Sequence, residues 1–425
     1  MNKYDVVIVG GGTAGVSCAW NAGKLGLKTL IVEKNSFLGG SITSSLVIPA
    51  MKTSNNAINT DFYNELYNLL KKLGGAIKYS DGNIGWFNPE LTKIALDILM
   101  NDANVDIKYE AMASSIQRKD NDNLLVYIDT IDSDNNQHSV DELLECIDTK
   151  YLVDATGDAK ICKKLNVKFL NDNDNFQPKS LRFIMSGVDI NKFSEWLLAF
   201  DTNREVTNST TVDGTTYLTT AYTWDSQGNW ALKPLFMDAI ANNIITEADS
   251  NYFQIFSVAG TKDAIAFNAP RFIDNILDVS KAYTEGRLSI LRLSNFCKKY
   301  LPGFENAYIS SIANSIGTRV SNRVKGKYIY SYNDLITGKK FSRPVLISNY
   351  PVDIHSNKKD KSTLEKVDIE YQLPLESLMV EEFDNLFVIG RSISADFKSQ
   401  AALRIIPSCF SMGEGLAKYL VSINS

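Results

Sequence analysis

The sequence contains few of the residue patterns that bind metals or cross membranes. Its five cysteines form no C-x-x-C or C-x-x-x-x-C pair, which disfavours an iron–sulfur cluster, a zinc site or a redox disulfide. No apolar run approaches the roughly 18 residues that a membrane-spanning helix needs. The first apolar strand starts three residues after Met1, which leaves no room for a signal peptide. We therefore expect a cytoplasmic protein with reduced thiols, no bound metal and no membrane partner.

Positive charge and histidine are also scarce. Lysine and arginine number 44 against 49 aspartates and glutamates, and the formal net charge of −5 disfavours nucleic acid as a partner. The two histidines, His138 and His355, leave few candidates for a general base near neutral pH. His138 lies in a polar turn, where we expect it to be solvated. With 425 residues, the chain can form two domains or one domain with large insertions.

The clearest positive signal is a glycine-rich turn directly after the first apolar strand. Residues 4–9 are a near-continuous apolar run, as a central parallel strand buried on both faces requires. Gly10 permits a tight turn into a helix, and Gly12 lets the backbone approach a pyrophosphate. Gly15 allows the helix to pack closely on the strand. This arrangement predicts a dinucleotide-binding turn.

The following helix and strand complete the dinucleotide signature. Backbone N–H groups near Thr13 and Ala14 would offer phosphates free donors and the positive end of the helix dipole. A second apolar strand, residues 29–32, ends at Glu33, which lies 23 residues after Gly10, close to the ~20 expected. A carboxylate at this position accepts a hydrogen bond from a ribose 2′-hydroxyl and repels a 2′-phosphate.

The last part of the chain contributes to the same site. Residues 385–390 form another apolar strand ending in glycine, which we expect to join the same sheet. We expect Gly390 to close this strand and Arg391 to serve the phosphates or the ribityl chain. A nucleotide domain completed by the C-terminus is not the layout of a simple dehydrogenase, and both ends of the chain together predict FAD.

A helix start near the C-terminus suits a flavin. Pro407 favours the first turn of a helix that we expect to run to about Val421. The N–H groups around Ile405 and Ile406 would then be unpaired donors, which stabilise the negative charge of a reduced flavin. The alternative is an ordinary C-terminal helix.

The predicted fold is α/β, a Rossmann-like FAD-binding domain with an inserted α+β substrate domain. Hydrophobic periodicity predicts helices over 60–73 and 89–100, and short strands with polar turns predict a β-meander over 105–153. The chain divides into three parts: residues 1–169, the first part of the FAD-binding domain; 170–350, a substrate or cap domain; and 351–425, the C-terminal part of the FAD-binding domain.

These motifs resemble the FAD-dependent oxidoreductases of the fumarate-reductase-like branch of the glutathione-reductase superfamily. The matching runs cover much of the chain: the Gly10 turn, Glu33-Lys34, 38–41, 153–158, 316–319, 350–355, 385–391 and 404–409. Two positions depart from the family pattern, Val320 in place of an acid and Ala159 in place of glycine. The resemblance implies further cofactor-binding residues, which are Lys34, Gly39, Gly40, Ser41, Ala155, Thr156 and Gly157.

Three side chains are candidates for the chemistry. His355 could act as a general base at the substrate or flavin, or could only hold its loop through a hydrogen bond. Arg404 stands at the expected helix start, where the resemblance implies an arginine that acts on the substrate. Arg319 and Arg323 share a face if residues 311–324 form a helix, and could clamp a carboxylate or pair with surface acids.

A single nucleotide fingerprint disfavours a reductase with its own NAD(P)H domain. The leading prediction is hydride transfer between flavin N5 and a small polar metabolite, with an unidentified electron acceptor or donor. The reaction would be C–OH or C–N oxidation, or C–C desaturation or reduction. The alternatives are an oxygen-using FAD oxidase or monooxygenase, and a non-redox FAD-binding protein that assists a partner. No histidine lies near Gly39 and Gly40, so we predict non-covalent FAD.

Overall fold

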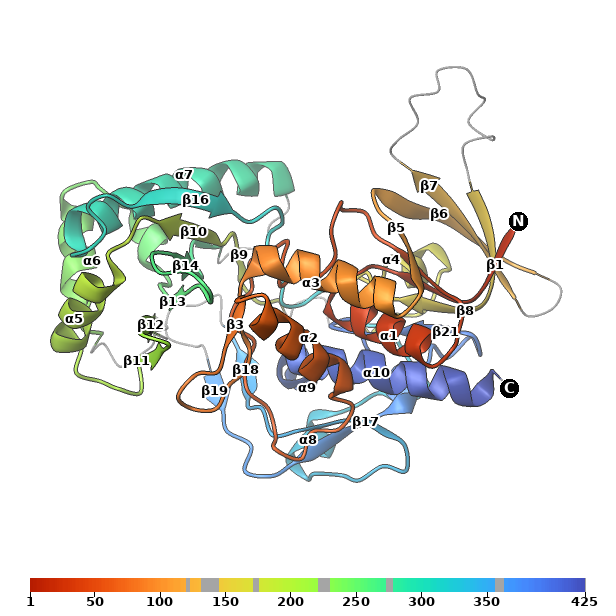
Figure 1. Cartoon of the computed structure of the whole chain (residues 1–425). Coiled ribbons are helices and arrows are strands. Elements are labelled where there is room, and N and C mark those ends of the chain that lie inside the picture. Colours follow the sequence, from red (N-terminus) through yellow and green to blue (C-terminus); the bar gives the residue numbers. More distant parts are fainter. Residues whose placement is uncertain are drawn as a thin grey trace, which may run out of the picture.

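The computed structural model describes residues 1–119, 123–130, 145–170, 176–220, 230–272, 278–355 and 363–424. Two lobes are visible in Figure 1. One lobe holds a seven-stranded sheet and both chain termini, and the other holds a six-stranded sheet with helices α5, α6 and α7. Helices α1, α3 and α10 lie beside the first sheet, on its side toward the second lobe (Figure 1). No helix within these ranges has both the length and the apolar character needed to cross a bilayer.

The first sheet has the parallel core that the sequence predicts. Its parallel strands run in the order β5-β2-β1-β8, with β21 also parallel to β8. Their bounds are β1 Asn2–Val9, β2 Thr29–Val32, β5 Val105–Lys108, β8 Glu145–Asp154 and β21 Leu386–Val388. Val9 pairs with Asp154, and Asp154 pairs with Val388, so these three strands end side by side. The turns that follow them therefore meet at one edge of the sheet.

Strand β8 pairs with three other strands of the first sheet. One edge of β8 pairs with β1, while the other pairs first with β7 (Leu124–Thr130) and then, at residues 152–154, with β21. Strand β6 (Ala111–Arg118) extends the antiparallel part. The meander predicted over 105–153 is thus confirmed for β6, β7 and β8 but is wrong for β5. That strand follows a helix, and the helical crossover returns it parallel to β2.

The helices of this lobe follow their apolar spacing. Helix α2 (Asp61–Lys72) buries Phe62, Leu66 and Leu70, which recur every four residues. Helix α3 (Pro89–Asp102) begins at Asn88, whose side chain accepts hydrogen bonds from the N–H groups of Glu90 and Leu91. Both helices, and α10 (Ile406–Ile423), match the predicted ranges to within two residues.

The second lobe is an antiparallel sheet covered by helices. Its strand order is β11-β12-β13-β14-β10-β16. The strands are β10 Phe183–Ser186, β11 Thr207–Val212, β12 Thr215–Thr220, β13 Ile255–Ser257, β14 Ile265–Phe267 and β16 Tyr308–Ile312, and the helices are α5 Ile190–Phe200, α6 Lys233–Ala241 and α7 Val279–Tyr300. This is the α+β composition predicted for the insertion. Its role as a substrate domain, and boundaries at 170 and 350, stay predictions.

The remaining elements of the described chain are short. They are β3 Ala76–Ile77, β4 Trp86–Phe87, α4 Lys160–Lys164, β9 Lys179–Ser180, η2 Glu247–Ser250, β15 Arg271–Phe272, α8 Tyr332–Ile336, β17 Pro344–Ser348, β18 Val352–Ile354, β19 Thr363–Glu365, β20 Tyr371–Pro374, η3 Leu375–Ser377 and α9 Phe397–Leu403. Strand β17 pairs with β20, and β18 pairs with β19. The segment that ends the second lobe is thereby tied to the C-terminal segment.

The helix considered for residues 311–324 does not form. Strand β16 ends at Ile312, and the chain then follows the backbone of residues 180–182. The N–H of Ala313 donates to Arg182, and Gly317 exchanges backbone hydrogen bonds with Ser180. These contacts satisfy the backbone groups that a helix would otherwise pair internally.

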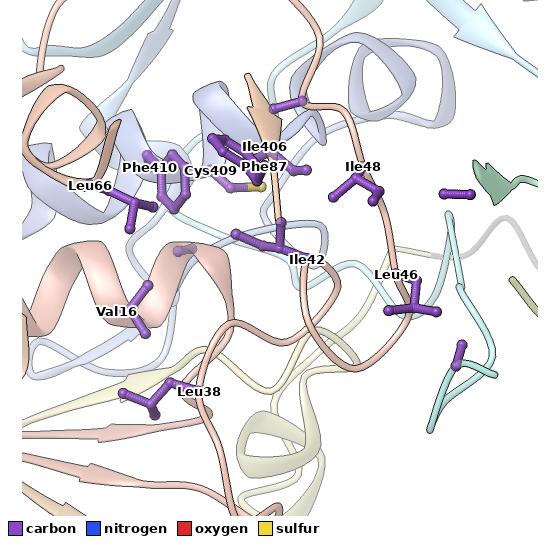
Figure 2. Close-up of a cluster of buried hydrophobic side chains, with 14 of the residues drawn as sticks. Val16, Leu38, Ile42, Leu46, Ile48, Leu66, Phe87, Ile406, Cys409 and Phe410 are labelled. Atoms are coloured by element: carbon purple, nitrogen blue, oxygen red, sulfur yellow. The ribbon is translucent and has the colours of Figure 1, made fainter. Parts of the chain in front are cut away.

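Helices α1 (Thr13–Lys24) and α10 pack in close contact. The Ser17 hydroxyl donates to the Phe410 carbonyl at 2.7 Å. A Cβ added to Gly413 would lie 2.2 Å from the carbonyl oxygen of Ala14. Figure 2 shows the apolar cluster beside this contact, where Val16 of α1 and Phe410 of α10 meet Leu66 of α2. The close approach of the two helices therefore requires a residue without a side chain at 413.

The Gly413→Ala variant tests this contact. Alanine raises helix propensity by roughly 0.5–1 kcal/mol, but the added carbon would overlap α1 and cost ~1–3 kcal/mol. We expect a net loss of unfolding free energy, measured by urea denaturation. Ser422→Ala, on an exposed position of the same helix, should change it by less than ~0.5 kcal/mol. A Gly413→Ala variant that is more stable than the parent would show that the helices can move apart.

Candidate functional site

The turn after β1 is held by close backbone contacts at the edge of the sheet. The Gly10 N–H donates to the Val32 carbonyl at 2.8 Å, and the Ala155 N–H donates to the Val9 carbonyl at 2.9 Å. Gly10 has φ +105°, and an added Cβ would lie 2.5 Å from the Ala155 carbonyl oxygen. Glycine is therefore required at position 10 both by conformation and by space.

The next glycines serve two different purposes. A Cβ on Gly15 would lie 2.0 Å from the Gly10 carbonyl oxygen, so this glycine allows α1 to approach β1. A Cβ on Gly12 would meet no described atom closer than Gly40 Cα, at 4.0 Å. The space beside Gly12 is thus open, as a bound pyrophosphate requires. The predicted cofactor-binding residues Thr13, Ala14 and Gly15 form the first turn of α1.

Glu33 holds the glycine turn through its carboxylate. It accepts hydrogen bonds from the Gly11 N–H at 2.8 Å and from the Asn35 N–H and side-chain amide at 2.9 and 2.7 Å. Gly39 donates to the Gly11 carbonyl at 2.8 Å, which places the second glycine pair beside the first. A carboxylate accepts about four hydrogen bonds, so Glu33 keeps capacity for a ribose hydroxyl. Its neighbour Lys34 is exposed.

The ends of β8 and β21 complete this edge. The Gly157 carbonyl accepts hydrogen bonds from the hydroxyls of Ser321 and Ser392, both at 2.7 Å. Arg391 pairs with Asp158 at 2.8 Å, and its buried Nε has no hydrogen-bond partner in the described part of the chain. The predicted cofactor residues on these two strand ends are Ala155, Thr156, Gly157, Gly390 and Arg391.

The start of α10 is fixed by apolar packing. No described side chain caps its first residues, so the N–H groups next to Ile405 and Ile406 remain available. Figure 2 shows Ile406 and Cys409 beside Ile42, which lies in the loop that begins at Gly40 and Ser41. Burial raises the pKa of Cys409 to about 11, so this thiol is protonated at neutral pH.

These features fit the cofactor that the sequence predicts. An open space at Gly12, a buried acid at Glu33, an unpaired donor on Arg391 and a free helix start at Ile406 all lie on the two converging chain ends. Each offers the contact that a diphosphate, a ribose or an anionic flavin ring needs.

Four arginines converge where the second lobe meets the start of α10. They are Arg182 before β10, Arg271 in β15, Arg319 after β16 and Arg404 between α9 and α10. Arg271 is 8% exposed and Arg319 is 9% exposed. Arg182 donates to the Leu46 carbonyl at 3.3 Å, which ties the cluster to the loop after Gly40. We call these four residues the arginine cluster.

Strand pairing explains why three of these arginines share one place. Ser180 pairs with Arg271 across the β9–β15 ladder and with Gly317 through an isolated bridge. Arg182 and Arg319 each follow a bridged residue by two positions, and side chains two apart in extended chain share a face. The Arg319 guanidinium accordingly lies at the Ser180 hydroxyl, 3.5 Å away, and also donates to the Pro178 carbonyl.

Asp353 and His355 lie within the arginine cluster. The Arg271 guanidinium is 3.2 Å from His355 Nδ1, and His355 Nε2 is 3.3 Å from Asp353 Oδ2. Arginine can only donate, so Nδ1 is the acceptor and the imidazole proton sits on Nε2, facing Asp353. Burial, with Arg319 and Arg271 nearby, lowers the pKa of His355 to about 3 against the opposing effect of Asp353. His355 is therefore neutral at physiological pH.

Gln177 joins His355 to Arg404. Its side-chain oxygen accepts from the backbone N–H of His355 at 3.2 Å and from the Arg404 guanidinium at 3.3 Å. Arg404 also donates to the Asp353 carbonyl at 3.1 Å. Among the residues that the structure describes, no acceptor meets the buried Gln177 Nε2, Arg271 Nε or Arg404 Nε. Three buried donors in one cluster thus remain unpaired.

The three predicted catalytic residues meet in this cluster, and three further residues join them. His355, Arg404 and Arg319 are brought together, whereas Arg323 donates instead to the Ala395 carbonyl at 3.1 Å. Gln177, Arg182 and Arg271 were not predicted. Both arginines stand inside apolar runs, Leu-Arg-Phe-Ile and Ala-Pro-Arg-Phe-Ile, and a charge in such a run signals burial.

The structure adds no metal centre within its described ranges. There, no group of three or more His, Cys, Asp or Glu side chains lies close enough to hold a metal ion. His138, which we expect to be solvated, lies outside the described residues.

Short stretches of the chain are similar to curated proteins. A dihydrolipoyl dehydrogenase of Trypanosoma brucei brucei is 51% identical over 49 residues, which are 12% of this chain and 10% of that protein. A thiamine thiazole synthase of Aeropyrum pernix is 47% identical over 40 residues, 9% of this chain and 15% of that protein. The matches thus span only a small part of these relatives' length.

Solved structures resemble the whole chain more distantly. The p-nitrophenol 4-monooxygenase of Pseudomonas putida aligns with a TM-score of 0.48 at 10% identity, covering 100% of this chain and 81% of that one. A geranylgeranyl bacteriochlorophyll reductase-like protein of Thermoplasma acidophilum aligns with a TM-score of 0.45 at 15% identity, covering 99% and 79%.

A family model covers nearly the whole sequence, from the first strand into the last helix. The model describes FAD dependent oxidoreductases and matches residues 5–420. This range includes the glycine turn, both strand ends at the sheet edge and the start of α10. The chain therefore belongs to the FAD-dependent oxidoreductase family.

Proposed function

We propose that this oxidoreductase transfers a hydride between flavin N5 and a small polar metabolite bound at the arginine cluster. The observation that carries the proposal is the set of buried, unpaired donors on Gln177, Arg271 and Arg404, the last of which directly precedes α10. The reaction class is oxidation of a C–OH or C–N bond, or desaturation or reduction of a C–C bond. Bound FAD would supply the hydride acceptor or donor. The resemblance to the fumarate-reductase-like branch supports the same assignment.

In this proposal the protein orients the metabolite and excludes water. Arg404 directly precedes α10 and is held by Gln177 and by the Asp353 carbonyl, so its position is fixed. Its free Nε and the N–H groups at Ile406 would stabilise negative charge that develops on either reactant. Arg319 is held by Pro178 and Ser180 and would bind the far part of the metabolite. Fixed donors of this kind need no rearrangement during the reaction.

We assign His355 a positioning role. Both of its ring nitrogens have partners within the protein, Arg271 and Asp353. A general base needs a free lone pair within reach of the substrate, and His355 Nδ1 has Arg271 in that position. The alternative that His355 holds its surroundings through hydrogen bonds is therefore the one we adopt. The Asp353–His355 pair would keep the guanidinium plane of Arg271 fixed.

Binding of FAD at the glycine turn gives a first prediction. Glu33→Ala should weaken binding, because a charge-assisted hydrogen bond contributes ~1.5–3 kcal/mol. Gly12→Val should weaken it further, since its side chain fills the open space at the turn. The measurement is the flavin absorbance per protein after gel filtration. Glu65→Ala, at an exposed position of α2, is the control and should keep its flavin. A parent protein that takes up no FAD would contradict the assignment.

Non-covalent attachment is checked on the same samples. The yellow colour should pass into the supernatant after acid precipitation, and colour retained in the pellet would indicate a covalent bond.

The reaction itself is tested by anaerobic screening of metabolites for bleaching of the flavin absorbance. With a metabolite that bleaches it, Arg404→Ala should keep its FAD and slow bleaching by roughly 10²–10³-fold, because a fixed charged donor is lost. Arg287→Ala removes an exposed arginine of α7 and should leave the rate unchanged. Bleaching that reverses only with oxygen, together with hydrogen peroxide or an oxygenated product, would favour the oxidase or monooxygenase alternative. A flavin that no metabolite reduces or oxidises would favour the non-redox one.

The neutral state of His355 predicts an acid-sensitive fold. The unfolded histidine binds a proton near pH 6.5, whereas the folded one resists protonation until about pH 3. Over that interval the unfolded state binds more protons, so the unfolding free energy falls as the pH falls. His355→Gln should flatten this dependence between pH 6.5 and 5, measured by urea denaturation of the holoenzyme. His138→Gln should retain the slope, and an unchanged slope in His355→Gln would show that His355 is not its source.

A further inference from the structure

We propose that Gln400 of α9 accepts a hydrogen bond from a hydroxyl group in the ribityl chain of bound FAD. The inference goes beyond the proposed reaction, because it concerns how the cofactor is held and does not depend on the substrate. Gln400 is fully buried, with 0% of its surface exposed. Its Oε1 has no donor among the residues that the structure describes. Buried polar atoms in native proteins nearly always have a partner, so a bound group is expected at this oxygen.

Two backbone carbonyls determine which end of the Gln400 amide is free. Its Nε2 donates to the Arg319 carbonyl at 3.0 Å and to the Arg391 carbonyl at 3.2 Å. Carbonyl oxygens only accept, so the opposite orientation of the amide would place Oε1 against two other acceptors. The two N–H bonds of the amide nitrogen are both used by these contacts. The free end of Gln400 is therefore an acceptor, and its ligand must supply a donor.

The need for a donor limits which part of FAD can meet Gln400. The diphosphate offers acceptors alone, which excludes it. The donors are the hydroxyls of the ribose and of the ribityl chain, the adenine amino group and the N3–H of the flavin ring. Arg391, whose carbonyl holds Gln400, can only donate, and its buried Nε has no acceptor within the described ranges. A hydroxyl both donates and accepts, so it suits a region with unpaired groups of both kinds.

The order of the strands separates Gln400 from the adenosine half of FAD. Glu33, which suits the adenosine ribose, follows β2, whereas Arg391 follows β21. Strands β1 and β8 lie between β2 and β21, and a strand spacing of ~4.8 Å puts the two strand ends about 14 Å apart. The ribose hydroxyls and the adenine amino group would therefore lie away from Gln400.

The position of Gln400 along the chain favours the ribityl hydroxyls over the flavin ring. The ribityl chain connects the diphosphate, which we assign to the turn at Gly12, with the ring, which we assign to the start of α10. Gln400 is bonded to the backbone at the end of β21 and belongs to α9, the helix before α10. It therefore lies between the elements that would hold the two ends of this chain. The ring N3–H is the competing donor, and the experiment separates the two.

The test compares holoenzymes loaded with FAD or with an analogue that lacks the ribityl hydroxyl at carbon 2′, 3′ or 4′. The measurement is the rate at which each cofactor leaves the holoenzyme after dilution, followed by flavin fluorescence. From the parent protein, one deoxy analogue should leave roughly 5- to 100-fold faster than FAD, because its loss strands a buried acceptor. In Gln400→Met this penalty should shrink by at least about fivefold, since methionine leaves no acceptor to strand.

The comparison of analogues is needed because Gln400→Met also frees the carbonyls of Arg319 and Arg391, which can speed the release of every cofactor. Gln117→Met, at an exposed position of β6, is the matched control and should keep the full penalty of the parent. If Gln400→Met does not fold, Gln400→Leu takes its place. Equal release of FAD and all three deoxy analogues from the parent would overturn the proposal without any variant.

A fourth analogue, 3-methyl-FAD, removes the ring N3–H. A penalty for 3-methyl-FAD that shrinks in Gln400→Met, with unchanged penalties for the deoxy analogues, would show that Gln400 meets the ring and that the ribityl assignment is wrong. Penalties that are the same in the parent and in Gln400→Met for all four analogues would also overturn the proposal. A penalty that depends on Gln400 for a deoxy analogue alone supports it.

Discussion

The contact between α1 and α10 determines the geometry of both helix starts at the cofactor edge. Ser17 and Phe410 are 393 residues apart in the chain, yet they are joined by a hydrogen bond. Gly413 allows the helix backbones to approach, and the neighbouring apolar cluster prevents them from sliding. One helix start faces the open space at Gly12, and the other directly follows Arg404. The nucleotide turn and the arginine cluster therefore keep a constant relation to each other.

The arginine cluster is a source of instability within the same framework. Buried like charges repel one another and lose the hydration they have in water, so the cluster weakens the fold unless something compensates. Part of the compensation comes from carbonyl oxygens of Leu46, Pro178 and Asp353, which accept from three of the arginines. Stability lost at such a site is typical of preorganised binding sites.

Local patterns made much of the first lobe predictable. The apolar run before Gly10, the 23-residue spacing from Gly10 to Glu33 and the four-residue spacing in α2 are patterns within short stretches of sequence, and each appeared as expected. Strand β5 was misassigned because its four residues look alike in a meander and in a parallel crossover. The helix considered for 311–324 failed for a different reason, because pairing with residues 180–182 satisfied its backbone.

By itself the sequence determined the nucleotide turn, the parallel core and the family, because those depend on backbone conformation and on hydrophobic periodicity, which are local. Only the tertiary structure brought Gln177, Arg182 and Arg271 to His355 and Arg404. These residues come from separate segments of the chain, and their proximity depends on the bridges at Ser180 and on the packing of α10. The protonation of His355 was likewise decided in three dimensions, since it depends on which groups surround the imidazole.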